Sequence, residues 1–199
     1  MDDDAATAIL AATHRALCDR GHADLTLADI AAEADTSTGL IHYYYDDKET
    51  LYAEFLDFLY DRYTGRIEAV EGETPRERLA ELFETVLADG EGAAGEQLRT
   101  AMLAVQTQAP HDERVRERLE QFDEFLYERV RSVVADGVEA GEFDDAVDPA
   151  AAAEFLVTAV AGAHARPVAV DRSSDRLAET VTRYAERHLV ADGPTGVPN

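Results

Sequence analysis

The chain has 199 residues, of which 46% are hydrophobic, and this is enough for one sizeable domain or two small ones that share an interface. Its formal net charge is −24, from 42 acids against 18 basic residues, and such an acidic excess by itself argues against a nucleic-acid partner. No apolar run approaches the roughly 20 residues that a membrane span requires, which argues against a membrane protein.

The first quarter of the chain predicts three helices and a turn. An apolar face recurs with helical spacing up to Gly21, which ends the first helix. Thr26 is the expected N-cap of a short second helix. Residues 35–37 form a turn, and residues 38–44 form a third helix. The apolar positions of the first two helices are Ile9, Ala12, Ala16, Leu17, Leu27, Ile30, Ala31 and Ala34.

The rest of the chain predicts six more helices, and no strand pattern is present. Asp46 or Asp47 begins a long fourth helix. Thr74-Pro75-Arg76-Glu77 combines a capping box with proline at the first helical position, and starts a fifth helix that runs to about Asp89. The remaining segments are a flexible loop at 89–96, a helix at 97–108, a long helix from Asp112 to near Gly141, a helix from Asp148-Pro149, a last helix from Ser173 or Ser174, and a disordered tail at 192–199. The fold class is therefore all-α, with about nine helices.

Residues 26–44 have the pattern of a helix-turn-helix unit, whose second helix enters the DNA major groove while the first braces it. We expect a buried side made of Ile30, Ala31, Ala34, Ile41 and Tyr45. The outward positions are small, hydroxylic or aromatic: Ser37, Thr38, Gly39, Leu40, His42, Tyr43 and Tyr44. None of them is acidic, in a chain where one residue in five is. Since carboxylates would repel phosphates, this pattern predicts a DNA-binding surface spared from the general acidity.

From Ile9 to Leu51 the chain resembles the DNA-binding domain of the TetR (tetracycline-repressor) family of transcriptional regulators. The residues that match the family pattern are Ile9, Leu10, Ala12, Gly21, Thr26, Ile30, Ala31, Ala34, Ser37, Gly39, Ile41, Tyr44, Lys48, Glu49 and Leu51. The chain departs from the pattern at Leu17, His22, Asp35, His42 and Tyr45. Asp35 replaces the turn glycine and tolerates a left-handed backbone better than most residues. His42 replaces a tyrosine and keeps a hydrogen-bond donor.

The resemblance implies a role for each residue of this surface. DNA phosphates would be contacted by Thr26, His42, Tyr44 and Lys48. The bases or the groove wall would be faced by Ser37, Thr38, Leu40 and Tyr43, and Gly39 belongs to the same DNA-binding set. Leu40 could pack on a thymine methyl group. Lys48 is the only lysine of the chain, and the alternative to a phosphate contact is a solvated surface lysine.

The resemblance also implies two domains: a DNA-binding domain at 1–50, and an effector-binding and dimerisation bundle at 51–191. The candidate pocket residues are Phe58, Tyr63, Phe83, Met102, Val105, Gln106, Phe122 and Phe125. They are mostly apolar or aromatic, which indicates a small apolar or amphipathic effector, although each one is individually more typical of core. The family usually dimerises through its last two helices. The candidate interface residues are Phe155, Leu156, Ala159, Val160, Ala163, Leu177, Val181, Tyr184 and Leu189, and the alternative is core within one chain.

No catalytic, cofactor-binding or metal-binding motif is present. In His111-Asp112-Glu113 we interpret Asp112 as an N-cap rather than a metal ligand. Cys18 cannot form an internal disulfide, which fits a reducing cytoplasm, and we expect a small core residue rather than a redox sensor. The acidic start MDDDAATAIL is unlike a secretory signal. The acids are spread along periodic helices, and with almost no lysine this resembles proteins of extreme halophiles.

The sequence thus predicts a dimeric, ligand-responsive transcriptional regulator, most often a repressor in this family, that binds a palindromic operator in double-stranded DNA. The effector would shift the separation of the two helix-turn-helix units away from the operator spacing. One alternative is a helical enzyme or ligand carrier, but no nucleophile–base pair is visible. Another is a non-specific architectural DNA protein, but residues 1–50 have only Arg15, Arg20 and Lys48 against 11 acids.

Overall fold

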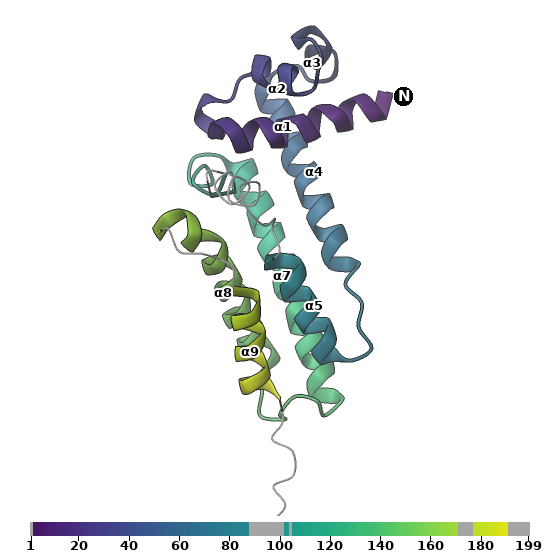
Figure 1. The fold of residues 1–199 in the computed structure, drawn as a ribbon, viewed down its shortest axis with the longest axis vertical. Helices are drawn as coiled ribbons and strands as arrows, with labels where there is room; N and C mark the ends of the chain where they lie inside the picture. The colour runs from purple at the N-terminus through teal and green to yellow at the C-terminus, as the bar shows by residue number, and fades with distance from the viewer. Residues whose placement is uncertain (1, 88–101, 104, 171–176, 191–199) are drawn as a thin grey trace, which may run out of the picture. The chain divides into compact units, whose positions relative to one another are not determined.

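The fold is all-α (Figure 1). This computed structural model describes residues 2–87, 102–103, 105–170 and 177–190. Within them there are eight named helices and no β-strand: α1 (Asp2–Asp24), α2 (Leu27–Glu33), α3 (Thr38–Tyr44), α4 (Lys48–Glu68), α5 (Pro75–Leu87), α7 (Glu113–Glu139), α8 (Pro149–Val170) and α9 (Leu177–Leu189). No helix of this described part is both long and apolar enough to cross a membrane.

Side-chain caps fix most helix starts, as the sequence predicts. Thr74 and Glu77 form the reciprocal capping box ahead of Pro75, with N–H···O distances of 3.2 Å in both directions. Asp47, and not Asp46, caps α4 by accepting the Thr50 amide at 2.7 Å. Asp112 caps α7 through the Arg114 and Val115 amides, and Asp148 caps α8 through the Ala150 and Ala151 amides. These carboxylates satisfy backbone donors that a helix start leaves without partners.

The chain divides into two compact units. The first contains the described residues up to Gly65 together with those from Met102 to Phe122, and the second contains the rest. The boundaries fall inside α4 and α7, so these two helices contribute to both units. The predicted boundary at residue 50 differs from this division, because Leu51, Phe55 and Leu56 of α4 are buried in the same core as the first three helices.

The core of the first unit lies beneath α2 and α3. Figure 1 shows α2 and α3 beside α1, and α1 packs on α2 as α2 packs on α3. The helix α1 is interrupted at Gly21, whose φ of 74° is accessible to glycine at little cost. The buried side chains come from all four helices and two later segments: Ile9, Ala16, Leu17, Leu25, Ile30, Ala31, Ile41, Tyr45, Leu51, Tyr52, Phe55, Leu56, Val105 and Val115.

The second unit packs α5 against α8 and α9, and α8 against α9. Arg76 at the start of α5 pairs with Glu186 of α9 at 2.7 Å, and Arg78 pairs with Asp136 of α7 at 2.9 Å. Gly137 is required where it lies, because a Cβ there would come within 2.2 Å of the Phe143 ring.

Some predicted segments lie outside the described residues. The loop at 89–96, the starts at Ser173 and Ser174 and the tail at 192–199 are among them, and so is half of the helix at 97–108. Of that helix, the described residues Met102, Leu103, Val105 and Gln106 are helical, whereas Thr107 and Gln108 form a turn, so the helix ends two residues earlier than predicted. The other helices appear where the sequence predicts them.

Candidate nucleic-acid interface

The turn between α2 and α3 depends on two residues. Asp35 has a φ of 50°, and it is the only residue other than glycine in the described chain with a positive φ. Ser37 is the N-cap of α3, and its hydroxyl accepts the Leu40 amide at 3.2 Å. The left-handed residue reverses the chain and the cap starts the next helix at once. The left-handed backbone at Asp35 agrees with the sequence prediction, while the cap at Ser37 is a feature that the sequence analysis missed; together they fix the direction of α3.

The buried side of this unit also agrees with the prediction. Ile30, Ala31, Ile41 and Tyr45 are all buried, with Ile41 completely inaccessible, while Ala34 is half-buried. Tyr45 follows α3 directly and donates its backbone amide to the Ile41 carbonyl at 2.9 Å. These contacts hold α3 on the core through one side only.

The opposite side of α3 is open to solvent. Tyr43 is 74% exposed and Leu40 38% exposed, which is unusual for large apolar side chains in this protein. Ser37, Thr38, Gly39 and His42 are exposed as well, and Tyr44 is half-buried. The ring of Tyr44 meets Tyr43 edge-on with centroids 5.1 Å apart. We name the exposed set Ser37, Thr38, Gly39, Leu40, His42 and Tyr43 the α3 face, and it contains no acid.

The N-terminus of α2 is already occupied by a carboxylate, which the sequence analysis missed. Asp29 accepts both the Thr26 amide, at 3.0 Å, and the Thr26 hydroxyl, at 2.6 Å, while its own amide donates to Thr26. These hydrogen bonds, with Arg20 at 3.2 Å, hold the pKa of Asp29 below its usual range. The spacing Thr-x-x-Asp was the available signal. A phosphate contact by the Thr26 hydroxyl therefore requires Asp29 to give up that partner.

Lys48 is bonded within the protein. Its Nζ donates to the backbone carbonyl of Leu25 at 2.5 Å, across 23 residues of chain. Arg15 pairs with Glu33 at 2.7 Å and Arg20 with Asp29, so all three cations of residues 2–50 have acceptors in this unit. The α3 face itself presents hydroxyl, imidazole and apolar groups and contains no lysine or arginine.

The predicted pocket residues are distributed over both units and differ in burial. Phe83 and Val105 are fully buried in the cores of different units, and Gln106 is exposed. Phe58, Tyr63, Met102, Phe122 and Phe125 are half-buried. Tyr63 and Phe122 stack with centroids 4.2 Å apart, and Tyr60 meets Phe122 at 5.8 Å. Arg118 lies over the Tyr60 ring, 4.8 Å from its centroid, and pairs with Asp57.

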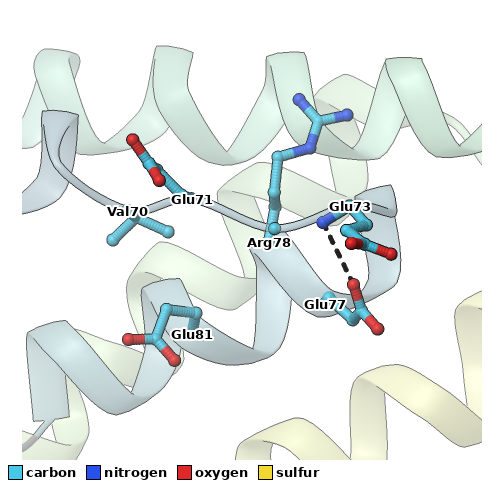
Figure 2. Close-up of a pocket in the computed structure, with 7 residues that line it drawn as sticks. Val70, Glu71, Glu73, Glu77, Arg78 and Glu81 are labelled. Atoms are coloured by element: carbon cyan, nitrogen blue, oxygen red, sulfur yellow. Dashed lines mark hydrogen bonds between the residues drawn. The ribbon is translucent and has the colours of Figure 1, made fainter.

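A cavity of about 790 Å³ lies in the second unit, at the start of α5 (Figure 2). It is lined by Val70, Glu71, Gly72, Glu73, Glu77, Arg78 and Glu81. Figure 2 shows Arg78 directed toward a neighbouring helix, where it pairs with Asp136, and Glu77 accepting the Glu73 amide at 3.1 Å. None of the predicted pocket residues lines this cavity, and its acidic lining is opposite in character to the apolar pocket that the sequence predicts.

The predicted interface residues fall into two groups. Leu156, Val160, Ala163 and Leu189 are buried within one protomer, so for these four the alternative interpretation as core is the better one. Phe155 and Tyr184 are exposed, and Ala159 and Val181 are half-buried. The side chain of Leu177 lies outside the described residues. An interface on α8 and α9 would therefore use Phe155 and Tyr184 most directly.

The candidate metal-binding and redox residues of the sequence can be located in the structure. No group of three or more His, Cys, Asp or Glu side chains there could hold a metal ion, and Asp112 is an N-cap, as predicted. Cys18 is half-buried against the core of the first unit. Burial raises the pKa of the Cys18 thiol, and Asp19 raises it further, which disfavours the reactive thiolate.

Two family models match the chain. The model described as bacterial regulatory proteins, tetR family, matches residues 9–55, and that described as BetI-type transcriptional repressor, C-terminal, matches residues 75–190. Together they cover the α3 face and most of the second unit. A comparison with curated proteins gave no match.

Solved structures of such regulators are similar over nearly the whole chain. A TetR transcription regulator from Haloarcula marismortui is 36% identical, with 94% of this chain and 99% of that chain covered and a TM-score of 0.84. A transcriptional regulator from Saccharomonospora viridis, in complex with choline, is 23% identical, with 96% and 100% covered and a TM-score of 0.80. A TetR-family regulator from Rhodococcus sp. is 21% identical, with 93% and 98% covered and a TM-score of 0.75. The last two show likeness of fold alone.

Proposed function

Since the chain belongs to the TetR family of transcriptional regulators, we propose that it is a ligand-responsive repressor that binds a palindromic operator as a homodimer. A regulator of this family is a DNA-binding protein and not an enzyme. The observation that carries the proposal is the α3 face: exposed and free of acids in a chain of net charge −24. We expect it to act in the cytoplasm.

The proposed DNA contacts follow the exposure of each residue. Leu40 and Tyr43 would read the groove, because they are large, exposed and held by a rigid helix. Ser37, Thr38 and Gly39 would allow close approach at the start of α3. His42 and Tyr44 would donate to phosphates. The ammonium of Lys48 has three N–H bonds, so two remain for phosphates beside the one given to Leu25. Thr26 is the weakest member, since Asp29 already engages its hydroxyl.

The proposed dimer places two copies together through α8 and α9. Phe155 and Tyr184 would form its apolar centre, because both rings are about half exposed in one protomer. Two-fold symmetry would then present two α3 faces to the two halves of a palindrome. The interface proposed here thus uses the same two helices as the sequence prediction, but fewer of the predicted residues.

The proposed effector is a small amphipathic molecule, and the aromatic cluster of Tyr60, Tyr63 and Phe122 supports a cationic one. Aromatic faces attract organic cations, and the Arg118 guanidinium already lies over Tyr60 with Asp57 as its counter-charge. The relative from Saccharomonospora viridis was solved with choline. A test is thermal unfolding with choline and with 3,3-dimethylbutanol, its neutral isostere. Stabilisation by choline alone supports a cation site, and stabilisation by neither removes choline as the effector.

The DNA-binding proposal is tested by selection from a pool of random duplexes in molar KCl, followed by gel-shift titration. The expected result is an enriched palindrome, bound at least about 1,000-fold more tightly than a scrambled duplex. Tyr43→Glu, which places a carboxylate on the α3 face, should abolish the shift. The matched control is Glu54→Gln on the exposed side of α4, which should bind normally. No enrichment with folded protein would reject the proposal, and equal affinity for all duplexes would favour an architectural protein.

A further inference from the structure

The two ends of the DNA-reading segment are joined by one side chain. Leu25 is the residue before the N-cap of α2, and Lys48 is the first residue of α4. Their hydrogen bond therefore closes a loop of chain that contains α2, the turn and α3 and little else. Within the described residues, this bond spans the whole reading unit, from the entry to α2 to the start of α4.

Both partners of this bond are fixed in position. The side chain of Leu25 is 2% exposed, so its backbone carbonyl is anchored in the core. At the other end, Asp47 caps α4, and Leu51 and Phe55 bury its first two turns in the same core. The half-buried Lys48 side chain therefore fixes the distance between Leu25 and the start of α4. The segment between these two points contains the α3 face.

The choice of residue fits this position. Lysine occurs once in the chain, whereas arginine supplies the other 17 basic residues. Arginine's planar fork is the better partner for carboxylates and phosphates, while lysine offers a compact donor on a flexible stem. A single carbonyl, reached through a half-buried stem, needs only the compact donor.

We propose that Lys48 is a positioning residue: by donating to the Leu25 carbonyl it holds the entry to α2 against the start of α4 and so sets the α3 face before DNA is bound. Only the expected effect of Lys48 on operator binding rests on the proposed function; the hydrogen bond itself does not. In the free protein the bond acts with no DNA present, and this separates it from a phosphate contact.

The first test uses the free protein. Lys48→Met keeps the length of the stem but removes the donor, and amide exchange of Thr26, Asp29 and Ile30 should then accelerate roughly 10- to 100-fold, as expected for loss of a charged hydrogen bond. Exchange of the Ala152 amide in the second unit should not change. Arg62→Met is the matched control, since Arg62 is exposed in the same unit and its loss removes an equal charge. Lys48→Arg should restore most of the protection. Unchanged exchange in Lys48→Met would overturn the proposal.

A second readout needs no variant. Because Lys48 is the only lysine, labelling with ¹⁵N-lysine gives one Nζ signal. In the free protein its protons should exchange more slowly with water than those of a free lysine ammonium. A signal with the exchange rate of free lysine would contradict the bond, even if Lys48→Met fails to fold.

The third test uses DNA. A displaced α3 face loses base readout, so Lys48→Met should weaken binding to the selected operator by at least about 10-fold more than binding to a scrambled duplex. Equal loss on both duplexes would indicate a phosphate contact alone and would overturn the positioning role. If wild type binds no duplex, the proposed function fails, while the exchange measurements still decide the role of the bond.

Discussion

The rings of Phe155 on α8 and Tyr184 on α9 stack with centroids 5.3 Å apart, although each is about half exposed. The Tyr184 ring in turn lies 4.2 Å from that of His188. Because the two rings stack on one another and remain about half exposed, much of their apolar surface is left uncovered in one protomer. A second copy meeting this surface would cover the rest, and aromatic side chains are enriched in the centres of such interfaces.

We predict that Phe155→Glu combined with Tyr184→Glu gives a folded monomer. Four like charges would face one another across a two-fold interface, while neither side chain is needed for the core of one protomer. Sedimentation in molar KCl measures the mass. The control is Ala69→Glu with Ala140→Glu, which adds the same charge at exposed positions of the second unit. A wild-type monomer, or a double variant that remains dimeric, contradicts the prediction.

We predict that the start of α2 is sensitive to acid because of Asp29. Hydrogen bonds from Thr26 lower the folded-state pKa of Asp29, so its stabilising contribution is present above the unfolded value of about 3.9 and is lost as pH falls through the folded value. The protection of the Thr26 amide, which compares its exchange rate with the intrinsic rate at the same pH, should therefore fall below about pH 4. In Asp29→Asn the Thr26 amide should already be weakly protected at neutral pH, and its protection should not fall further below about pH 4. A wild-type profile that is flat to pH 2 would remove Asp29 from this role.

We predict opposite outcomes for two neighbours on α3. Ile41→Ala should lower the free energy of unfolding by about 2 to 5 kcal/mol, because the side chain is completely buried. Tyr43→Ala should change it by no more than about 0.5 kcal/mol, because the ring is mostly exposed. Denaturant unfolding measures both. Tyr43→Ala should instead change which operator is preferred, and an unchanged preference would exclude Tyr43 from base readout.

We predict that folding requires salt. A net charge of −24 destabilises the compact state by self-repulsion, and KCl screens it. The melting temperature followed by circular dichroism should fall when KCl is lowered from 2 M to 0.1 M. A sucrose solution of equal osmolality serves as the control for exclusion effects. Equal stability at both salt concentrations would refute the halophilic interpretation of the composition.

The sequence predicts structural features that arise between neighbouring residues, such as helix caps and turns. It misses contacts between residues that are far apart in the chain. The caps at Thr74, Asp112 and Asp148 and the left-handed Asp35 are local chemistry, and all are present. The bond from Lys48 to Leu25 joins residues 23 positions apart, and no spacing rule predicts it. The sequence could therefore place Lys48 correctly at the start of a helix without revealing its acceptor.

Apolar periodicity also does not reveal whether the apolar face of a helix packs in the core of its own chain or against another molecule. Leu156 and Val160 recur with Phe155 on α8 at spacings that fit either a core or an interface, and only packing shows that the first two are covered by their own protomer. The same ambiguity explains Phe83, which fits an apolar pocket by its chemistry but lies completely inside the second core. Periodicity identifies buried positions, but the element that buries them is a property of the fold.

The central claim is that an acidic protein reads DNA through short-range contacts of the α3 face. In residues 1–50 three cations face 11 acids, so long-range attraction is absent, and in concentrated KCl the release of counterions contributes little. Fluorescence anisotropy of the selected operator and a scrambled duplex, titrated from 0.2 to 2 M KCl, tests this most directly. We predict that operator affinity stays level or rises with KCl while the scrambled duplex binds weakly throughout. A steep fall in operator affinity with KCl, as for proteins held by phosphate contacts, would contradict the account.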